Sequence, residues 1–226
     1  MSVLLDLWDE FCGEHTISVS SVPLFDADEA GVVATFGYGR NERLMLRRSG
    51  AMEAKLIDTV NAVLSAPATK YEGILYMMHR IGPAGRVVPL YIGRAGRHGR
   101  LGAAVSANLT NMERNKGKFA RWGYNYFYHM GDLSAASLPG HTVGGTEKYR
   151  NWAKALFECS PSSAPVLRFD VRFWCTAWGP EAIGIWREFN PCPLAFAEYL
   201  LIGVAGVLFP NDLLNEEGVN RVAATD

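Results

Sequence analysis

The chain has 226 residues, of which 49% are hydrophobic and 20% are charged. These proportions exclude wholesale disorder and suffice for one larger domain, or for one domain of about 100–150 residues with an accessory piece. The net charge is only −1, but residues 79–121 contain nine Lys and Arg against one acid, Glu113, which makes this segment +8. It gives a polyanion one place to dock, or it is an ordinary solvated basic surface.

The cysteines and the apolar segments indicate the compartment. Four cysteines lie far apart without a CxxC pair, which argues against a disulfide framework and a cysteine-rich zinc site. The first residues carry acids where a secretory signal has basic residues. The longest apolar run, residues 194–209, is shorter than the roughly 20 residues that span a bilayer. We therefore expect a cytoplasmic protein without membrane contact, and residues 194–209 to form a buried helix.

The first seventy residues predict a small accessory α/β segment. Residues 3–11 have the pattern of a short amphipathic helix. Two short strands, 32–38 and 43–46, are expected on either side of a Gly-Arg-Asn turn. Residues 51–64 place apolar groups at helical spacing and stop before Ser-Ala-Pro.

The remainder, residues 71–226, predicts a second region that opens with two antiparallel strands, 73–78 and 87–92, joined by a Gly- and Pro-rich loop. The aromatic segment 122–130 is either a strand with tyrosines facing DNA or, more commonly, core. Residues 149–157 have helical character, and residues 166–177 are expected to form a third strand. His129 and His141 have no partner spacing and are interpreted as structural or surface groups. The expected fold is α/β (α+β): a small, mainly antiparallel sheet flanked by helices, with an insertion around residues 102–165.

Glu198 is the most informative single residue. It is the only charged side chain in the sixteen-residue apolar run 194–209. Burying an unpaired carboxylate costs several kcal/mol, so Glu198 requires a cation. That cation is either an arginine in a structural ion pair or a divalent metal at the mouth of a cleft.

Three short motifs resemble those of the GIY-YIG nuclease family. They are Gly73-Ile74-Leu75, Tyr91-Ile92-Gly93, and the segment 194–202 with its Ala-Glu and Leu-Ile pairs, followed by Pro210 and the asparagines Asn211 and Asn215. The first motif departs from the family, because Leu75 stands where the signature has tyrosine and Tyr76 follows one residue later. The resemblance implies a GIY-YIG-like domain and a metal-dependent DNA endonuclease.

The resemblance also implies a set of catalytic roles. Tyr91 would position or deprotonate the attacking water, Tyr76 would hydrogen-bond within the cluster, and Glu198 would anchor Mg²⁺ (or Mn²⁺). An arginine would stabilise charge on the phosphate. Arg100 or Arg97 is expected to be that arginine, with Arg121 and Arg150 as further candidates. Asn215, or Asn211, would steady the cleft.

Nucleic-acid contacts are expected from the glycine-punctuated basic loop after residue 93 and from the basic run that follows it. The candidates are Arg94, His98, Arg114, Lys116, Lys118 and Arg121. Residues 193–202 are most similar to the restriction branch of the family, which implies a role in restriction or phage defence. Cutting both strands would call for a homodimer or two binding events.

The sequence is compatible with three other functions. One is a catalytically inactive nucleic-acid-binding module of the same fold, which the leucine at position 75 favours. Another is a repair or structure-specific nuclease. A small-molecule enzyme with Cys175 or Cys192 as nucleophile has little support, because no histidine or acid lies at suggestive spacing.

Overall fold

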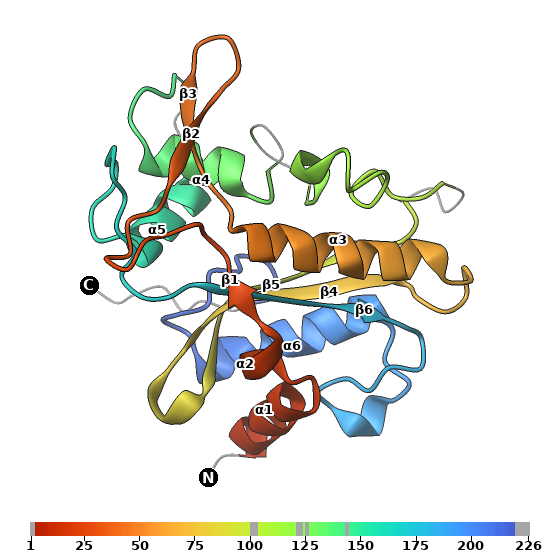
Figure 1. Ribbon diagram of the computed structural model, residues 1–226. Helices are drawn as coiled ribbons and strands as arrows, with labels where there is room; N and C mark the ends of the chain where they lie inside the picture. Colours follow the sequence, from red (N-terminus) through yellow and green to blue (C-terminus); the bar gives the residue numbers. More distant parts are fainter. Residues whose placement is uncertain (1–2, 100–103, 121–123, 125–126, 143–144, 220–226) are drawn as a thin grey trace.

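The computed structural model describes residues 3–99, 104–120, 124, 127–142 and 145–219. Its centre is a four-stranded antiparallel sheet with the strand order β1-β6-β4-β5 (Figure 1). The strands are β1 (Val22–Pro23), β4 (Gly73–Ile81), β5 (Val87–Gly96) and β6 (Arg172–Trp178). A second, two-stranded sheet pairs β2 (Thr35–Tyr38) with β3 (Arg43–Leu46). The prediction of an α+β fold with a small antiparallel sheet is confirmed.

Helices cover both faces of the central sheet. One face is covered by α3 (Gly50–Ser65) and the other by α6 (Leu194–Leu208) (Figure 1). On the α3 side lie α4 (Met130–Ser137) and α5 (Glu147–Leu156), and on the α6 side lie α1 (Val3–Glu14) and α2 (Ile17–Ser20). Short 3₁₀ turns occur at Pro83–Gly85, Lys116–Lys118 and Arg187–Phe189. Of the helices described, none has the length and apolar character needed to cross a membrane.

The two covering helices form where the sequence predicts them. Ser49 caps α3, because its hydroxyl accepts a hydrogen bond from the Met52 amide at 2.9 Å. Buried residues of α3 recur every three or four positions at Met52, Leu56, Val60 and Val63, which gives the helix one apolar face. The inner face of α6 is likewise apolar and buried.

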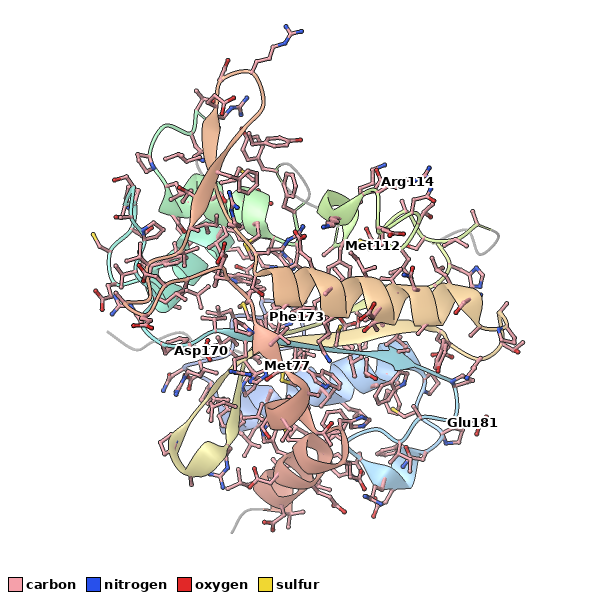
Figure 2. All side chains as sticks on the ribbon, viewed as in Figure 1. Met77, Met112, Arg114, Asp170, Phe173 and Glu181 are labelled. Carbon is pink, nitrogen blue, oxygen red and sulfur yellow. The ribbon has the colours of Figure 1, made fainter. Side chains whose placement is uncertain are left out.

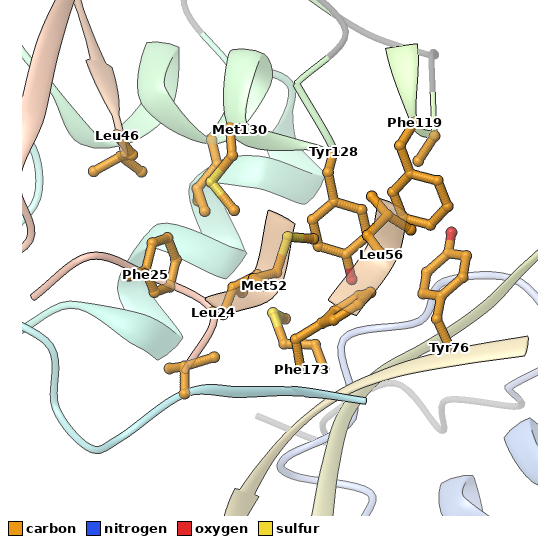
Figure 3. Close-up of a cluster of buried hydrophobic side chains, with 14 of the residues drawn as sticks. Leu24, Phe25, Leu46, Met52, Leu56, Tyr76, Phe119, Tyr128, Met130 and Phe173 are labelled. Carbon is orange, nitrogen blue, oxygen red and sulfur yellow. The ribbon is translucent and has the colours of Figure 1, made fainter. Parts of the chain in front are cut away.

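Alternation along the strands divides the interior into two cores. Phe173 of β6 faces the α3 side, where it packs with Tyr76, Phe119 and Tyr128 (Figure 3). Met77 of β4 faces the α6 side (Figure 2). We call these two clusters the α3-side core and the α6-side core. The alternation has a direct consequence for the first motif: Leu75 lies in the α6-side core and Tyr76 in the α3-side core.

Close contacts within the sheet explain the glycines of the two tripeptide motifs. Gly93 lies opposite Tyr76 in the register of β4 and β5, and a Cβ at this position would lie 2.6 Å from the Tyr76 hydroxyl. A Cβ at Gly73 would lie 2.2 Å from the Ala95 carbonyl oxygen. Neither position has room for a side chain, so packing alone requires glycine at both.

Residues 1–70, expected as an accessory segment, contribute to the central layers. Strand β1 pairs with β6 at the edge of the sheet, and α3 covers one of its faces. Helix α1 packs on the opposite side, where the Trp8 indole donates a hydrogen bond to the Val87 carbonyl at 2.9 Å. The described part of the expected insertion, residues 102–165, contains α4 and α5 and closes the α3-side core.

The structure decides between the two alternatives for residues 122–130 and corrects the start of the third strand. The described residues of the segment 122–130 do not form a strand: Tyr124 and Tyr128 lie in turns, and Met130 begins α4. Tyr128 belongs to the α3-side core and Phe127 packs against it, as the core alternative for this segment expects. The third strand starts at Arg172 and not at Val166, because Val166 and Leu167 make only isolated bridges, to Val32 and Phe157.

Candidate active site at the edge of strand β5

A pocket of about 480 Å³ opens beside β5, the terminal strand of the sheet. Its wall combines the strand with α5, α6 and the segment that follows α6. The lining residues are Tyr91, Lys148, Glu198, Tyr199, Ile202, Asn215, Glu216 and Glu217. Three residues proposed from the sequence, Tyr91, Glu198 and Asn215, therefore meet in one place.

Asn215 closes the open edge of β5. Its side-chain oxygen accepts a hydrogen bond from the Ile92 amide at 2.9 Å, and its amide group donates to the Ile92 carbonyl at 2.8 Å. The neighbouring Leu214 amide donates to the Leu90 carbonyl at 2.7 Å. These bonds satisfy backbone groups at the edge of the strand. They also fix the chain at residues 214 and 215, so Glu216 and Glu217, which follow directly, are held at the pocket. Asn211, the alternative from the sequence, is exposed and does not line the pocket.

Glu198 has a cationic partner in this structure. Its Oε2 accepts a hydrogen bond from Arg94 Nε at 2.7 Å, and its side chain is only 18% exposed. Burial raises the pKa of the Glu198 carboxyl, the Arg94 guanidinium opposes that rise, and the Glu217 carboxylate adds to it. Of the two cations expected for Glu198, an arginine or a metal, the structure contains the arginine. Arg94, expected to contact nucleic acid, forms an ion pair with this carboxylate.

Tyr91 belongs to the α3-side core and also lines the pocket. Its ring centroid lies 5.0 Å from those of His129 and Trp152. Burial raises the pKa of the Tyr91 hydroxyl, and the carboxylates of Glu198 and Glu217 raise it further. The hydroxyl is therefore protonated at neutral pH and acts as a hydrogen-bond donor unless positive charge is added to the pocket.

Lys148 is a functional candidate that the sequence analysis missed. It lies in the first turn of α5, lines the pocket, and places its Nζ 5.3 Å from the centroid of the Tyr91 ring. Glu217 was missed as well. Neither residue has a sequence signal, because only the packing of α5 and of the segment after α6 against β5 brings them to Tyr91.

Tyr76 lies behind Tyr91 and not in the pocket. It is 0% exposed, and its ring centroid is 6.3 Å from that of Tyr91. Its hydroxyl makes no well-formed hydrogen bond to the described residues. It lies close enough to the Tyr91 hydroxyl to lower the pKa of Tyr91 and so to oppose the effect of burial. The pKa of Tyr76 itself lies well above its ordinary value, mainly because of burial. Tyr76 thus supports Tyr91 from within the core.

Arg97 lies at the end of α3, not at the pocket. Its guanidinium is buried and donates to three backbone carbonyls, those of Val63 at 2.7 Å, Ala66 at 3.0 Å and Pro67 at 3.1 Å. These carbonyls end a helix and attract a cation, so Arg97 acts as a cap. Arg150 is exposed and donates to the Gly145 carbonyl. Arg100 and Arg121 lie outside the described residues.

The remaining nucleic-acid candidates lie elsewhere on the surface. His98 is exposed and forms an isolated bridge with Val105. Arg114, Lys116 and Lys118 are exposed around the 3₁₀ turn and line a different cavity, beside Tyr38 of β2. Figure 2 shows Arg114 on this loop. Lys116 is ion-paired with Glu53 at 2.9 Å.

The donor set of the pocket is compatible with a hard divalent cation. Carboxylates of Glu198 and Glu217 face the same space, and Mg²⁺ is commonly held by one or two carboxylates and several waters. Within the described ranges, no three His, Cys, Asp or Glu side chains come together as a larger metal cage. Mg²⁺ or Mn²⁺ would therefore rely on Glu198 and Glu217, in competition with Arg94.

Comparisons with models of known families, with curated proteins and with solved structures found no match to this chain. The GIY-YIG resemblance stays a prediction from the motifs.

Proposed function

We propose that this protein is a metal-dependent endonuclease that hydrolyses phosphodiester bonds of DNA. The observation that carries the proposal is the convergence of Tyr91, Lys148 and Glu198 on one pocket. These side chains supply a hydroxyl, a cation and a half-buried carboxylate, which are the groups that phosphodiester hydrolysis uses. They come from three separate elements, β5, α5 and α6.

Each residue has a defined task in such a reaction. The Tyr91 hydroxyl would hold the attacking water by a hydrogen bond, with its direction fixed by the ring packing against His129 and Trp152. The Lys148 ammonium would neutralise a phosphate oxygen at the face of that ring. Asn215 would keep the strand edge and the acidic segment in register.

The carboxylates are the reason to include a metal. A bound Mg²⁺ or Mn²⁺, held by Glu198 and Glu217, would supply the positive charge that stabilises the phosphate in its transition state. Without a cation these carboxylates raise the pKa of Tyr91 and repel the phosphate. Arg94 would hold the Glu198 side chain in place at the pocket wall.

We place the activity in restriction or phage defence, because residues 193–202 are most similar to that branch of the nuclease family. A repair or structure-specific nuclease would use the same pocket and differ in the DNA that it selects.

A second candidate is a nucleic-acid-binding module without catalysis. The observation that favours it is the Arg94–Glu198 ion pair at 2.7 Å, which balances the carboxylate without a metal. The absence of tyrosine at position 75 points the same way, since Leu75 faces the α6-side core and not the pocket wall.

The test is cleavage of plasmid, linear and single-stranded DNA by the wild type and by Glu198→Gln, with Mg²⁺, Mn²⁺ or EDTA. The matched control is Glu181→Gln, because Glu181 is an exposed glutamate on a distant loop (Figure 2). We expect metal-dependent cutting by the wild type and the control, and a rate on the order of a hundredfold lower for Glu198→Gln. Equal cutting by all three proteins would rule out this pocket. Binding without cutting under every metal condition would favour the binding module.

A further inference from the structure

The β2–β3 hairpin projects from the body of the molecule and is firmly held at its base (Figure 1). The Leu46 amide donates a hydrogen bond to the Ser134 hydroxyl of α4 at 2.9 Å. His141 Nε2 donates to the Leu44 carbonyl at 2.8 Å. The hairpin therefore combines a base fixed to helix α4 with a tip that extends into solvent.

The tip carries four consecutive side chains of the kinds that recognise base edges: Arg40, Asn41, Glu42 and Arg43. Arginine pairs with guanine, asparagine with adenine, and glutamate accepts from cytosine. Among the residues that the structure describes, Arg40 and Asn41 have no hydrogen-bonding or ion-pair partner, and both are exposed. The guanidinium of Arg43 lies 5.5 Å from the centroid of the Tyr124 ring, so Arg43 is held against the segment before α4 and the side chains of Arg40 and Asn41 are the ones left for DNA.

A basic loop lies next to the hairpin. The two are separated by a cavity of about 510 Å³ that is lined by Tyr38 on the hairpin and by Arg114, Lys116 and Lys118 on the loop. Tyr38 is 40% exposed, and Arg114 and Lys118 make no ion pair with any described residue. The tip and the loop together carry five basic side chains and two acidic ones, Glu42 and Glu113.

We propose that the β2–β3 hairpin enters the major groove of duplex DNA and reads base pairs, while the loop around Lys116–Lys118 binds the phosphate backbone. The major groove of B-DNA admits a two-stranded β-ribbon, whereas the major groove of an RNA duplex is too narrow for side chains to read. Phosphate contacts fix the position of the protein, and base contacts specify the sequence. The inference rests on the proposed function, which supplies DNA as the ligand. The surface that it concerns is separate from the β5 pocket.

The experiment measures binding in EDTA, so that cleavage does not interfere. Full-length protein is incubated with a randomised DNA duplex library, and the bound fraction is sequenced. The variants are Arg40→Ala, Asn41→Ala and the triple replacement of Arg114, Lys116 and Lys118 by alanine. Arg86→Ala is the control, because it removes one positive charge, ion-paired with Asp9, from the turn between β4 and β5, far from the hairpin tip.

We expect the wild type and Arg86→Ala to enrich the same motif. Arg40→Ala and Asn41→Ala should each lose about tenfold or more of the preference at one or two base pairs, with little change in affinity for mixed-sequence DNA. The triple variant should weaken binding to all sequences and reduce the salt slope by about 2–3.

Two results of this experiment would overturn the inference: no enriched motif with the wild type, or an unchanged motif with both hairpin variants. Equal binding of RNA and DNA duplexes, measured in the same EDTA buffer, would overturn it as well. A failure of the nuclease proposal is distinguishable from these results. A protein that reads a motif through the hairpin but never cuts would refute catalysis alone, and one that cuts while its hairpin variants keep the motif would refute the hairpin alone.

Discussion

Replacing Gly93 by alanine tests whether packing explains the glycine that ends the second motif. The new Cβ would lie 2.6 Å from both Cζ and Oη of Tyr76 and 2.8 Å from Cε2. Ordinary contacts between carbon atoms are about 3.5–4.0 Å, so the overlap is about 1 Å. Tyr76 has no space to yield, because the rings of Phe119 and Tyr128 lie 5.2 and 5.6 Å away (Figure 3). We expect this overpacking to cost about 1–3 kcal/mol.

The assay is urea and thermal unfolding of purified protein. For a chain of this size, about 1–3 kcal/mol corresponds to a melting temperature lower by roughly 2–12 °C. Tyr76→Phe removes one of the three overlapping atoms and should suppress part of the loss in the double mutant. Gly203→Ala is the control: nothing lies within 4 Å of its Cβ position in α6, and alanine there should stabilise by about 0.5–1 kcal/mol. Wild-type stability of Gly93→Ala, or the absence of coupling to Tyr76, would refute the packing argument.

Two further predictions concern charges in the interior. Arg97→Gln should lower the free energy of unfolding, measured by urea titration, by about 2 kcal/mol, because it loses charge-assisted hydrogen bonds to the end of α3. The control Arg40→Gln should change the free energy of unfolding by less than about 0.5 kcal/mol. Burial lowers the pKa of His79 to about 4 and that of His129 to about 3. Between pH 7 and pH 5 these two histidines therefore take up protons in the unfolded chain but stay neutral in the folded protein. Stability should therefore fall by about 2 kcal/mol for each histidine between pH 7 and pH 5, and His79→Gln should remove about half of that histidine-linked loss. Titrations at pH 7, 6 and 5 check this, and identical pH profiles for the wild type and His79→Gln would contradict the burial of a neutral imidazole.

The sequence predicts the elements whose pattern is local. Apolar spacing locates α3, the long apolar run locates α6, and the two tripeptide motifs mark β4 and β5. The place of β1 could not be predicted, because its two residues pair with β6, which lies about 150 residues further along the chain. The aromatic pattern around Tyr128 allowed a strand or a core segment, and burial of Tyr128 beside Phe119 and Tyr76 decides for the core.

The site was predictable where a single residue contradicted its surroundings. Glu198 stands out in an apolar helix, and Tyr91 begins the Tyr-Ile-Gly motif, so both could be proposed from the sequence. Lys148 and Glu217 reach the pocket only through tertiary packing. Arg97 shows the opposite limit: an arginine in a glycine-rich basic loop has the same pattern whether it binds a phosphate or the carbonyls at a helix end.

The two surfaces differ in how their charge would respond to a metal. At the β5 pocket, the carboxylates of Glu198, Glu216 and Glu217 outnumber the cations of Lys148 and Arg94, so the pocket carries one excess negative charge and repels a phosphate. A divalent cation would reverse that sign and would also favour ionisation of Tyr91. The hairpin and its neighbouring loop are positive without any metal. We therefore expect EDTA to separate the two activities, leaving DNA binding by the hairpin surface intact while cleavage at the pocket is lost. Binding that itself required Mg²⁺ would mean that the pocket, and not the hairpin, provides the principal contact with DNA.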